Sequence, residues 1–233
     1  MINWELQCFE AIDSTQSYVI DHIDQLGDWT CVQSLSQNHG KGRHGRKWVS
    51  PEGNLYISFV LTPNIPNENL SQIALVTGLT VVHALDPYVD VVLKWPNDVL
   101  LEGKKICGIL IDCIGSRLVV GLGVNIQHAP IEGSTNLSKN MLDVDFVRDR
   151  ILSCFSSLYE SYIKDGFSNI RDDWIKNSFP RDTRMSVKIG DREITGQYKG
   201  LDESGYLLLL CDKTNKVINI TSGDVFPNHV TRD

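Results

Sequence analysis

Gly40-Lys41-Gly42-Arg43-His44-Gly45-Arg46-Lys47-Trp48 is the stretch from which the rest of this 233-residue chain is best understood. It holds four cations, three glycines and one tryptophan, whereas the whole chain has a formal net charge of -7. Glycine costs backbone entropy in a helix or strand, and clustered like charges repel each other. The stretch therefore predicts a loop. Backbone N–H groups and arginine forks suit phosphate or carboxylate, so we expect the loop to close on an anion under Trp48.

Composition limits the other readings of this loop, which are a solvated surface loop and a nucleic-acid patch. The net charge argues against general affinity for DNA, RNA or an anionic membrane. No apolar run approaches the ~20 residues that span a bilayer, and residues 1–12 contain no signal-peptide pattern. The six cysteines are scattered without CxxC spacing, and the histidines lack metal-ligand spacing. We expect a cytoplasmic protein with reduced thiols and no structural zinc.

Regular elements are predicted on both sides of the loop. Asp13 followed by Gln16 indicates a helix start, and apolar spacing carries that helix to residue 26. Strands are expected at 29–35 and 54–62, and an amphipathic helix at 67–85. The centre of the chain predicts an antiparallel meander, with its strands at 89–95, 99–101, 105–112 and 117–124.

The C-terminal third changes character at Phe179-Pro180. Helical patterns at 143–165 and 169–178 precede this point. Short strands with closely spaced turns follow it, which is typical of a small β-barrel. The sequence thus predicts two domains, a binding domain at 1–180 and a small domain at 181–233.

Two more stretches carry polar residues in apolar surroundings. Lys94-Trp95-Pro96-Asn97-Asp98 breaks a strand and precedes Lys105-Ile106-Cys107-Gly108-Ile109-Leu110. Asp98 suits a turn or a Mg²⁺ ion near phosphates, and Lys105 an exposed strand start or an anion contact. Gly121-Leu122-Gly123-Val124-Asn125 suits a bulge and a turn. It also suits close approach of a ligand, with Asn125 at an adenine edge.

Together these stretches resemble the biotin protein ligases, over nearly the whole chain. The resemblance rests on the two stretches just quoted, on Gly40–Trp48 and on Asp13-Ser14-Thr15, all in this order. It implies an α+β fold: a mixed, mainly antiparallel sheet flanked by helices, like that of class II synthetases, followed by an SH3-like β-barrel. It also implies an ATP- and Mg²⁺-dependent ligase. Biotin is activated to biotinyl-5′-AMP with release of pyrophosphate and then transferred to a lysine of a biotin carboxyl carrier protein. No tightly bound prosthetic group is expected.

The resemblance assigns roles position by position. Arg43 and Lys105 would be catalytic, with Lys105 bridging the biotin carboxylate and the α-phosphate. Asp98 would lie near Mg²⁺. The ATP-binding set comprises Arg43, Arg46, Trp48, Asn97, Lys105 and Asn125. The biotin-binding set comprises Ser14, Thr15, Gln16, Gln37, Gly40, Lys41, Gly42, Arg43, Lys105 and Gly108.

Some residues depart from the pattern of the family. Gln16 stands where many relatives have asparagine, and Lys41 and His44 replace arginines of the loop. No arginine occurs near residues 224–227 to match one that reaches the nucleotide in repressor-type relatives, which leaves the part of the small barrel in ATP binding open. The motifs begin at Asp13 and leave no room for a DNA-binding domain, so we expect a monofunctional ligase that binds no DNA. A homodimer is plausible for this family.

Two rival functions remain at this point. A lipoate or octanoate ligase or transferase shares the superfold, although the basic loop and the Lys94–Asp98 stretch favour biotin. A non-catalytic biotin sensor or nucleic-acid-binding module would be expected to lose the phosphate-binding cations, and this sequence retains them.

Overall fold

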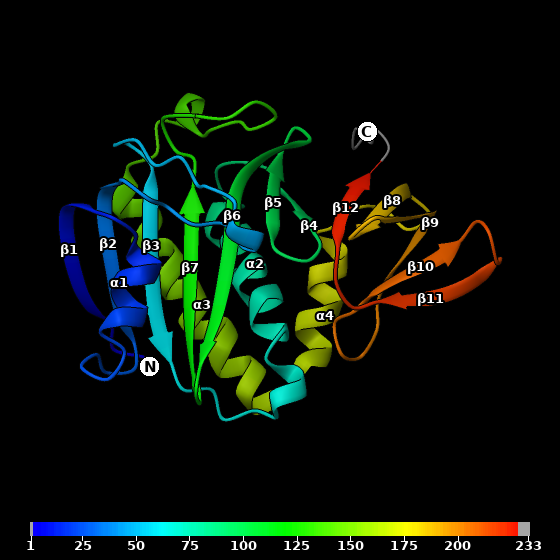
Figure 1. Ribbon diagram of the computed structural model, residues 1–233, viewed down its shortest axis with the longest axis horizontal. Coiled ribbons are helices and arrows are strands. Elements are labelled where there is room, and N and C mark those ends of the chain that lie inside the picture. Colours follow the sequence, from blue (N-terminus) through cyan, green and yellow to red (C-terminus); the bar gives the residue numbers. More distant parts are fainter. Residues whose placement is uncertain (1, 228–233) are drawn as a thin grey trace.

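The computed structural model describes residues 2–227, which form two sheets with helices packed on them (Figure 1). The larger sheet has seven strands in the order β1-β2-β3-β7-β6-β5-β4. Only β1 and β2 pair in parallel, and the other neighbours are antiparallel. The strands are β1 (Glu5–Ile12), β2 (Thr30–Gln37), β3 (Leu55–Leu61), β4 (Val92–Lys94), β5 (Asp98–Leu101), β6 (Lys104–Ile114) and β7 (Arg117–Val124).

Three helices cover one face of this sheet (Figure 1). They are α2 (Gln72–Leu85), α3 (Val144–Asp165) and α4 (Phe167–Lys176). Alternate residues of β3, such as Leu55, Ile57 and Phe59, point into the main core beneath them. Asp143 caps α3, and its carboxylate accepts hydrogen bonds from two backbone N–H groups of the first turn. This buried layer holds the strands that carry the site.

Among the described α-helices, the short α1 (Thr15–Asp21) is the one on the opposite face (Figure 1), and a pocket lies beside it on this face. Val19 of α1 packs on Val60 and Val119 in a small second core. Because strand residues alternate between faces, Ser58 of β3 and Gly121 and Gly123 of β7 also lie on this side. The pocket face therefore combines small and polar residues in otherwise apolar strands.

The smaller sheet has five strands in the order β11-β10-β9-β8-β12. It is open rather than a closed barrel, since no described residues pair β11 with β12. It packs on the larger body: the Trp95 indole donates a hydrogen bond to Gly205 O at 3.0 Å, and apolar residues of both sheets share one core. Its strands are β8 (Arg184–Ile189), β9 (Arg192–Leu201), β10 (Leu207–Cys211), β11 (Lys216–Ile220) and β12 (Asp224–Pro227).

Most predicted elements are confirmed, with five differences. The helix predicted at 67–85 begins only at Gln72, after a separate 3₁₀ turn at Asn67–Asn69. Ser14 caps α1 instead of Asp13, whose carboxylate pairs with His39. Helix α1 ends at Asp21, and turns continue to residue 26. Strands β1 and β12 had not been predicted, and the small domain is an open sheet. None of the helices within residues 2–227 combines the length and the apolar character that crossing a membrane would need.

Candidate active site

The pocket on the open face has a volume of about 290 Å³ and lies between α1, the basic loop, β6, β7 and β12. Thirteen of the fifteen predicted site residues line it. They are Ser14, Thr15, Gln16, Gln37, Lys41, Gly42, Arg43, Arg46, Trp48, Asn97, Asp98, Lys105 and Gly108. Gly40 and Asn125 do not. The fold thus gathers side chains from segments more than 90 residues apart into one site.

One end of the pocket is polar and uncharged. The first turn of α1 brings Thr15 to Gln37 at the end of β2, and the Thr15 N–H donates to Gln37 Oε1 at 2.8 Å. Thr15 Oγ1 lies 2.8 Å from Ser58 Oγ, and the Ser58 hydroxyl donates to Gln16 Oε1 at 2.9 Å. All four side chains are linked, and three of them are almost fully buried. Such an end can hydrogen-bond a neutral polar ligand group.

Three glycines of β6 and β7 form the floor, and each leaves room for a side chain of this same chain. A Cβ on Gly121 would collide with Gln16 Oε1, and one on Gly123 would lie 2.5 Å from the Trp48 ring. A Cβ on Gly108 would lie 2.9 Å from Trp48 and 3.1 Å from Lys105 Nζ. The sequence predicts that a ligand approaches the glycines of residues 121–125. In this structure the side chains of Gln16, Trp48 and Lys105 occupy the space next to the three glycines.

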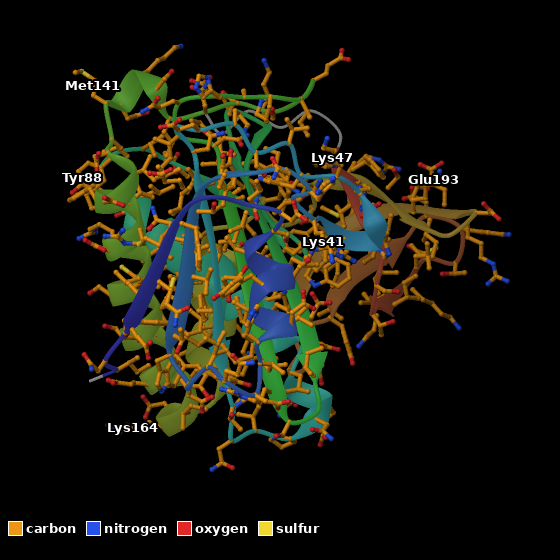
Figure 2. All side chains as sticks on the ribbon, turned by 60° about the vertical axis from the view of Figure 1, so that its left-hand side comes forward. Lys41, Lys47, Tyr88, Met141, Lys164 and Glu193 are labelled. Atoms are coloured by element: carbon orange, nitrogen blue, oxygen red, sulfur yellow. The ribbon has the colours of Figure 1, made fainter. Side chains whose placement is uncertain are left out.

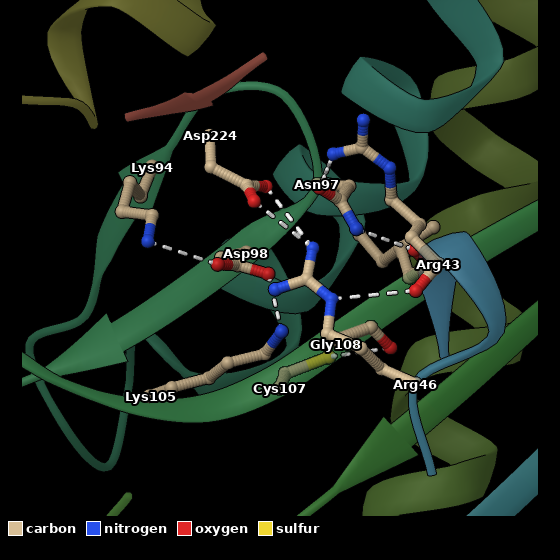
Figure 3. A network of polar contacts seen from close by, with 10 residues as sticks. Arg43, Arg46, Lys94, Asn97, Asp98, Lys105, Cys107, Gly108 and Asp224 are labelled. Carbon is tan, nitrogen blue, oxygen red and sulfur yellow. Dashed lines mark hydrogen bonds and ion pairs between the residues drawn. The ribbon is translucent and has the colours of Figure 1, made fainter. Parts of the chain in front are cut away.

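The other end of the pocket is cationic (Figure 3). Arg43 Nη1 donates to Asn97 Oδ1 at 2.7 Å, and Arg46 Nη2 lies 3.1 Å from both carboxylate oxygens of Asp224. Lys105 Nζ lies 2.5 Å from Asp98 Oδ1, and Lys94 Nζ lies 3.1 Å from Asp98 Oδ2. Four cations from three segments thus converge on one space, which suits a polyanion such as a nucleotide phosphate.

Asp98 balances the two lysines of this end. Burial opposes ionisation of its carboxyl group, but the ammonium groups of Lys105 and Lys94 outweigh burial and hold its pKa below the ordinary value. Each carboxylate oxygen is engaged by one lysine. No group of three His, Cys, Asp or Glu side chains that could hold a metal occurs within residues 2–227. The role of Asp98 as a metal ligand stays a prediction.

Cys107 lies beside this charged end and had no predicted role. It is fully buried, and burial raises the pKa of its thiol to about 12. A protonated, enclosed thiol is a poor nucleophile. Cys107 is therefore a core residue of β6.

The basic loop itself forms a tight turn, because its glycines permit the necessary backbone conformations. Trp48 N–H donates to Gly40 O at 2.8 Å and Gly42 N–H to Arg46 O at 2.7 Å, which closes the turn around the short 3₁₀ segment Arg43–Gly45. Gly45 has a φ of 70°, in the left-handed region. Figure 2 shows Lys41 and Lys47 where this loop faces the smaller sheet. The loop is a wall of the pocket.

Trp48 and Asn125 lie together at the inner edge of this wall. Lys105 Nζ lies 5.3 Å from the centre of the Trp48 ring. Trp48 Nε1 and Asn125 Oδ1 are buried and have no hydrogen-bond partner among the described residues. Buried polar atoms without partners are uncommon and fit groups that await a ligand. Asn125 also holds the segment after β7 through a hydrogen bond from its Nδ2 to Thr135 O at 3.1 Å.

Gly40 has a structural position outside the pocket. A Cβ there would lie 2.5 Å from Ser50 Oγ, so Gly40 lets the two ends of the loop meet. Several residues line the pocket although the sequence predicts no role for them: Ser58, Lys94, Asp224 and Phe226. Ser58 and Lys94 gave a signal, since each is a polar residue within an apolar strand. Asp224 and Phe226 gave none, because they reach the pocket only through the packing of β12.

Comparisons with known proteins agree with this geometry. Residues 8–127 match the family described as the Biotin/lipoate A/B protein ligase family, and residues 185–226 match the Biotin protein ligase C terminal domain. The chain is 30% identical over 220 residues to the Biotin--[acetyl-CoA-carboxylase] ligase of Paracoccus denitrificans, covering 84% of this chain and 90% of that protein. It is 31% identical over 215 residues to the Bifunctional ligase/repressor BirA of Bacillus subtilis, covering 84% of this chain and 65% of that protein.

A solved structure is similar over almost its full length. It is the biotin protein ligase from Aquifex aeolicus in complex with biotin and ATP, with a TM-score of 0.86 and 30% identity. The match covers 97% of this chain and 99% of that one. The first family match alone spans more than half of the chain. The chain therefore belongs to the biotin protein ligase family.

Proposed function

We propose that this protein is an ATP-dependent biotin protein ligase, which activates biotin to biotinyl-5′-AMP and transfers it to a lysine of a biotin carboxyl carrier protein. The observation that carries this proposal is the division of one pocket into a neutral polar end at Thr15, Gln37 and Ser58 and a cationic end at Arg43, Arg46, Lys94 and Lys105. Biotin has a neutral ring with polar groups and an anionic carboxylate, and ATP is a polyanion. The pocket offers matching chemistry at each end.

In the first step a carboxylate oxygen of biotin attacks the α-phosphorus of ATP. An O–P bond forms, the bond to the β-phosphate breaks, and pyrophosphate leaves with the electron pair. Two anions must approach each other, so fixed cations lower the barrier. Lys105 would leave Asp98 to lie between the carboxylate and the α-phosphate, while Arg43 and Arg46 would hold the phosphates.

In the second step a lysine amine of the carrier protein attacks the acyl carbon of the adenylate. A C–N bond forms, the C–O bond to the phosphate breaks, AMP leaves and the amine loses a proton. The mixed anhydride is prone to hydrolysis, so a site that excludes water protects it. Trp48 and the basic loop would provide this cover.

Magnesium is part of the proposal only as a companion of ATP. Asp98 pairs with Lys94 and Lys105 in this structure, and it would be the carboxylate nearest the ion once Lys105 has moved to the substrates. Mg²⁺ is commonly held by a few carboxylates together with phosphate oxygens. The charge stabilisation is therefore assigned to the lysines and arginines of this chain.

The test is exchange of labelled pyrophosphate into ATP by the purified protein, with biotin and lipoate in parallel. Exchange that depends on biotin supports the proposal. Exchange with lipoate alone would move the function to lipoate activation. If the folded protein binds biotin but catalyses no exchange, the result would favour a non-catalytic biotin sensor.

Lys105→Ala tests the assigned role of Lys105. Loss of a positioned cation at developing charge costs on the order of 10²–10³ in rate, and we expect at least that loss of exchange. Lys104→Ala is the matched control, because Lys104 is the exposed neighbour on the same strand. Near-normal exchange by folded Lys105→Ala would reject the role.

The remaining predictions about partners depend on the same activity. Transfer to a lysine of a carrier domain is tested by measuring whether labelled biotin becomes attached to a purified carrier protein. The expected homodimer, the expected absence of DNA binding and the separate domain at 181–233 stay predictions. Use of ATP fits the expected cytoplasmic location.

A further inference from the structure

Gln16 lines the neutral end of the pocket, but its amide is occupied by groups of the protein. Gln16 Nε2 donates to Asp112 Oδ2 at 2.9 Å and to Val119 O at 3.0 Å. Gln16 Oε1 accepts from the Ser58 hydroxyl at 2.9 Å. Both N–H bonds of the amide are therefore used. The contact between Gln16 and biotin stays a prediction, and the hydrogen bonds give Gln16 a connecting role as well.

Chemistry fixes the direction of every hydrogen bond in this connection. A carboxylate and a backbone carbonyl only accept, so Gln16 turns its NH₂ group to Asp112 and Val119 and its oxygen to Ser58. Ser58 has one hydroxyl hydrogen, and Gln16 receives it. In the 2.8 Å contact between Thr15 and Ser58, Thr15 is then the donor, and Gln37 Oε1, 3.3 Å from Thr15 Oγ1, is the other acceptor within its reach. The Thr15 hydroxyl is left with lone pairs for the pocket and no hydrogen to donate.

We propose that Asp112 is a positioning residue for substrate recognition: together with the Val119 carbonyl it orients Gln16, which takes the Ser58 hydrogen and so leaves the lone pairs of the Thr15 hydroxyl to accept from a ligand N–H. This rests on the proposed function. The biotin ring carries two N–H donors, and the lipoate ring carries none. Asp112 of β6, which is partly exposed and does not itself line the pocket, thus contributes to the choice of biotin over lipoate.

Asp112 acts through the length of the Gln16 side chain. An asparagine at this position, shorter by one methylene, would not span from Ser58 to Asp112. Gly121 belongs to the same arrangement, because a Cβ there would collide with Gln16 Oε1. The residues of this chain therefore form a matched set, and the effect of Asp112 should depend on glutamine at position 16.

The experiment is a double-mutant cycle of Asp112→Ala and Gln16→Asn in the biotin-dependent exchange assay. One lost charged hydrogen bond is worth roughly tenfold in an equilibrium constant. We expect Asp112→Ala to raise the KM for biotin roughly tenfold, with kcat and the KM for ATP unchanged and the preference for biotin over lipoate reduced. In the Gln16→Asn background the same substitution should add nothing.

Two controls separate positioning from stability. Asp112→Asn keeps an oxygen acceptor for Gln16 without the charge, and we expect its KM for biotin to stay near that of the original protein. Glu10→Ala removes an exposed carboxylate from β1 and should change neither constant. Equal effects of Asp112→Ala in both backgrounds, or a fall in kcat alone, would overturn the proposal. Absence of biotin-dependent exchange in the unaltered protein would instead reject the proposed function.

Discussion

Asp98 is the residue on which the charge balance of the empty pocket depends most. Its carboxylate is partly buried, with the side chain 14% exposed, between two lysines that come from different strands, Lys94 of β4 and Lys105 of β6. Removing its charge leaves both ammonium groups without a counter-ion in a partly buried site. That arrangement makes the stability of the protein sensitive to acid.

We expect Asp98→Asn to lower the free energy of unfolding at pH 7 by roughly 1–3 kcal/mol. The pKa of Asp98 lies below its ordinary value of 3.8 in the folded protein. The unfolded state thus binds more protons in acid, and the stabilisation, complete at neutral pH, is lost as the pH falls below about 4 toward the folded-state pKa. Urea unfolding of both proteins at about pH 7, 5 and 3 should show the difference shrink. A difference that stays constant would contradict this account, and Glu10→Gln serves as the exposed control.

At the scale of elements, the basic loop and β12 are joined by one ion pair. Arg46 and Asp224 come from segments 178 residues apart, and their side chains are 60% and 38% exposed. An exposed pair of this kind contributes little to global stability. The ion pair instead fixes the position of the basic loop, because it joins Arg46 of the loop to Asp224 of the smaller sheet.

Asp224→Ala should therefore free the loop without unfolding the protein. We expect trypsin to cleave after Arg43 and Lys47 several-fold faster in the variant, with the free energy of unfolding changed by less than about 1 kcal/mol. Asp212→Ala is a matched control, because it removes a pair of similar exposure with Arg184, away from the loop. Unchanged cleavage of the Asp224 variant, or equal acceleration in the control, would show that the pair does not order the loop.

The same scale shows what sequence can predict. The β5–β6 hairpin turns at residues 102–103, both with positive φ, and such turns and apolar periods are local signals. Strand β1 pairs in parallel with β2 across α1, and its residues alternate weakly, so no local signal revealed it. The motif residues were found because they are contiguous. Asp224 reaches the pocket, and Asp112 reaches Gln16, only through pairing and packing over long sequence distances.

At the scale of the whole molecule, the two sheets share one apolar core. Val187, Tyr198 and Leu209 of the smaller sheet belong to the same buried cluster as the strands under α2 and α3. The Trp95 indole, next to Asn97 and Asp98, bonds to the turn before β10. The smaller sheet is thus built into the support of the site.

We expect the two sheets to unfold in one cooperative transition. Native-state hydrogen exchange should give the same opening free energy for the slowest amides of β3 and β9, because neither sheet keeps its core without the other. Trp95→Phe should lower both values together by about 1 kcal/mol, the worth of a typical hydrogen bond. A lower opening free energy confined to β9 would indicate an independently unfolding domain.

The ion pairs within the pocket also weaken its binding of phosphate esters other than its substrate. Cells are crowded with phosphate esters, and a bare cluster of cations would attract them indiscriminately. Here a phosphate group must first displace Asp98 from Lys105 or Asp224 from Arg46. The new ion pairs that it forms are little stronger than the ones that it breaks. Only a ligand that makes further contacts elsewhere in the pocket therefore binds with a net gain in free energy. The two carboxylates, Asp98 and Asp224, thus favour a ligand that fills both ends of the pocket over a simple phosphate ester.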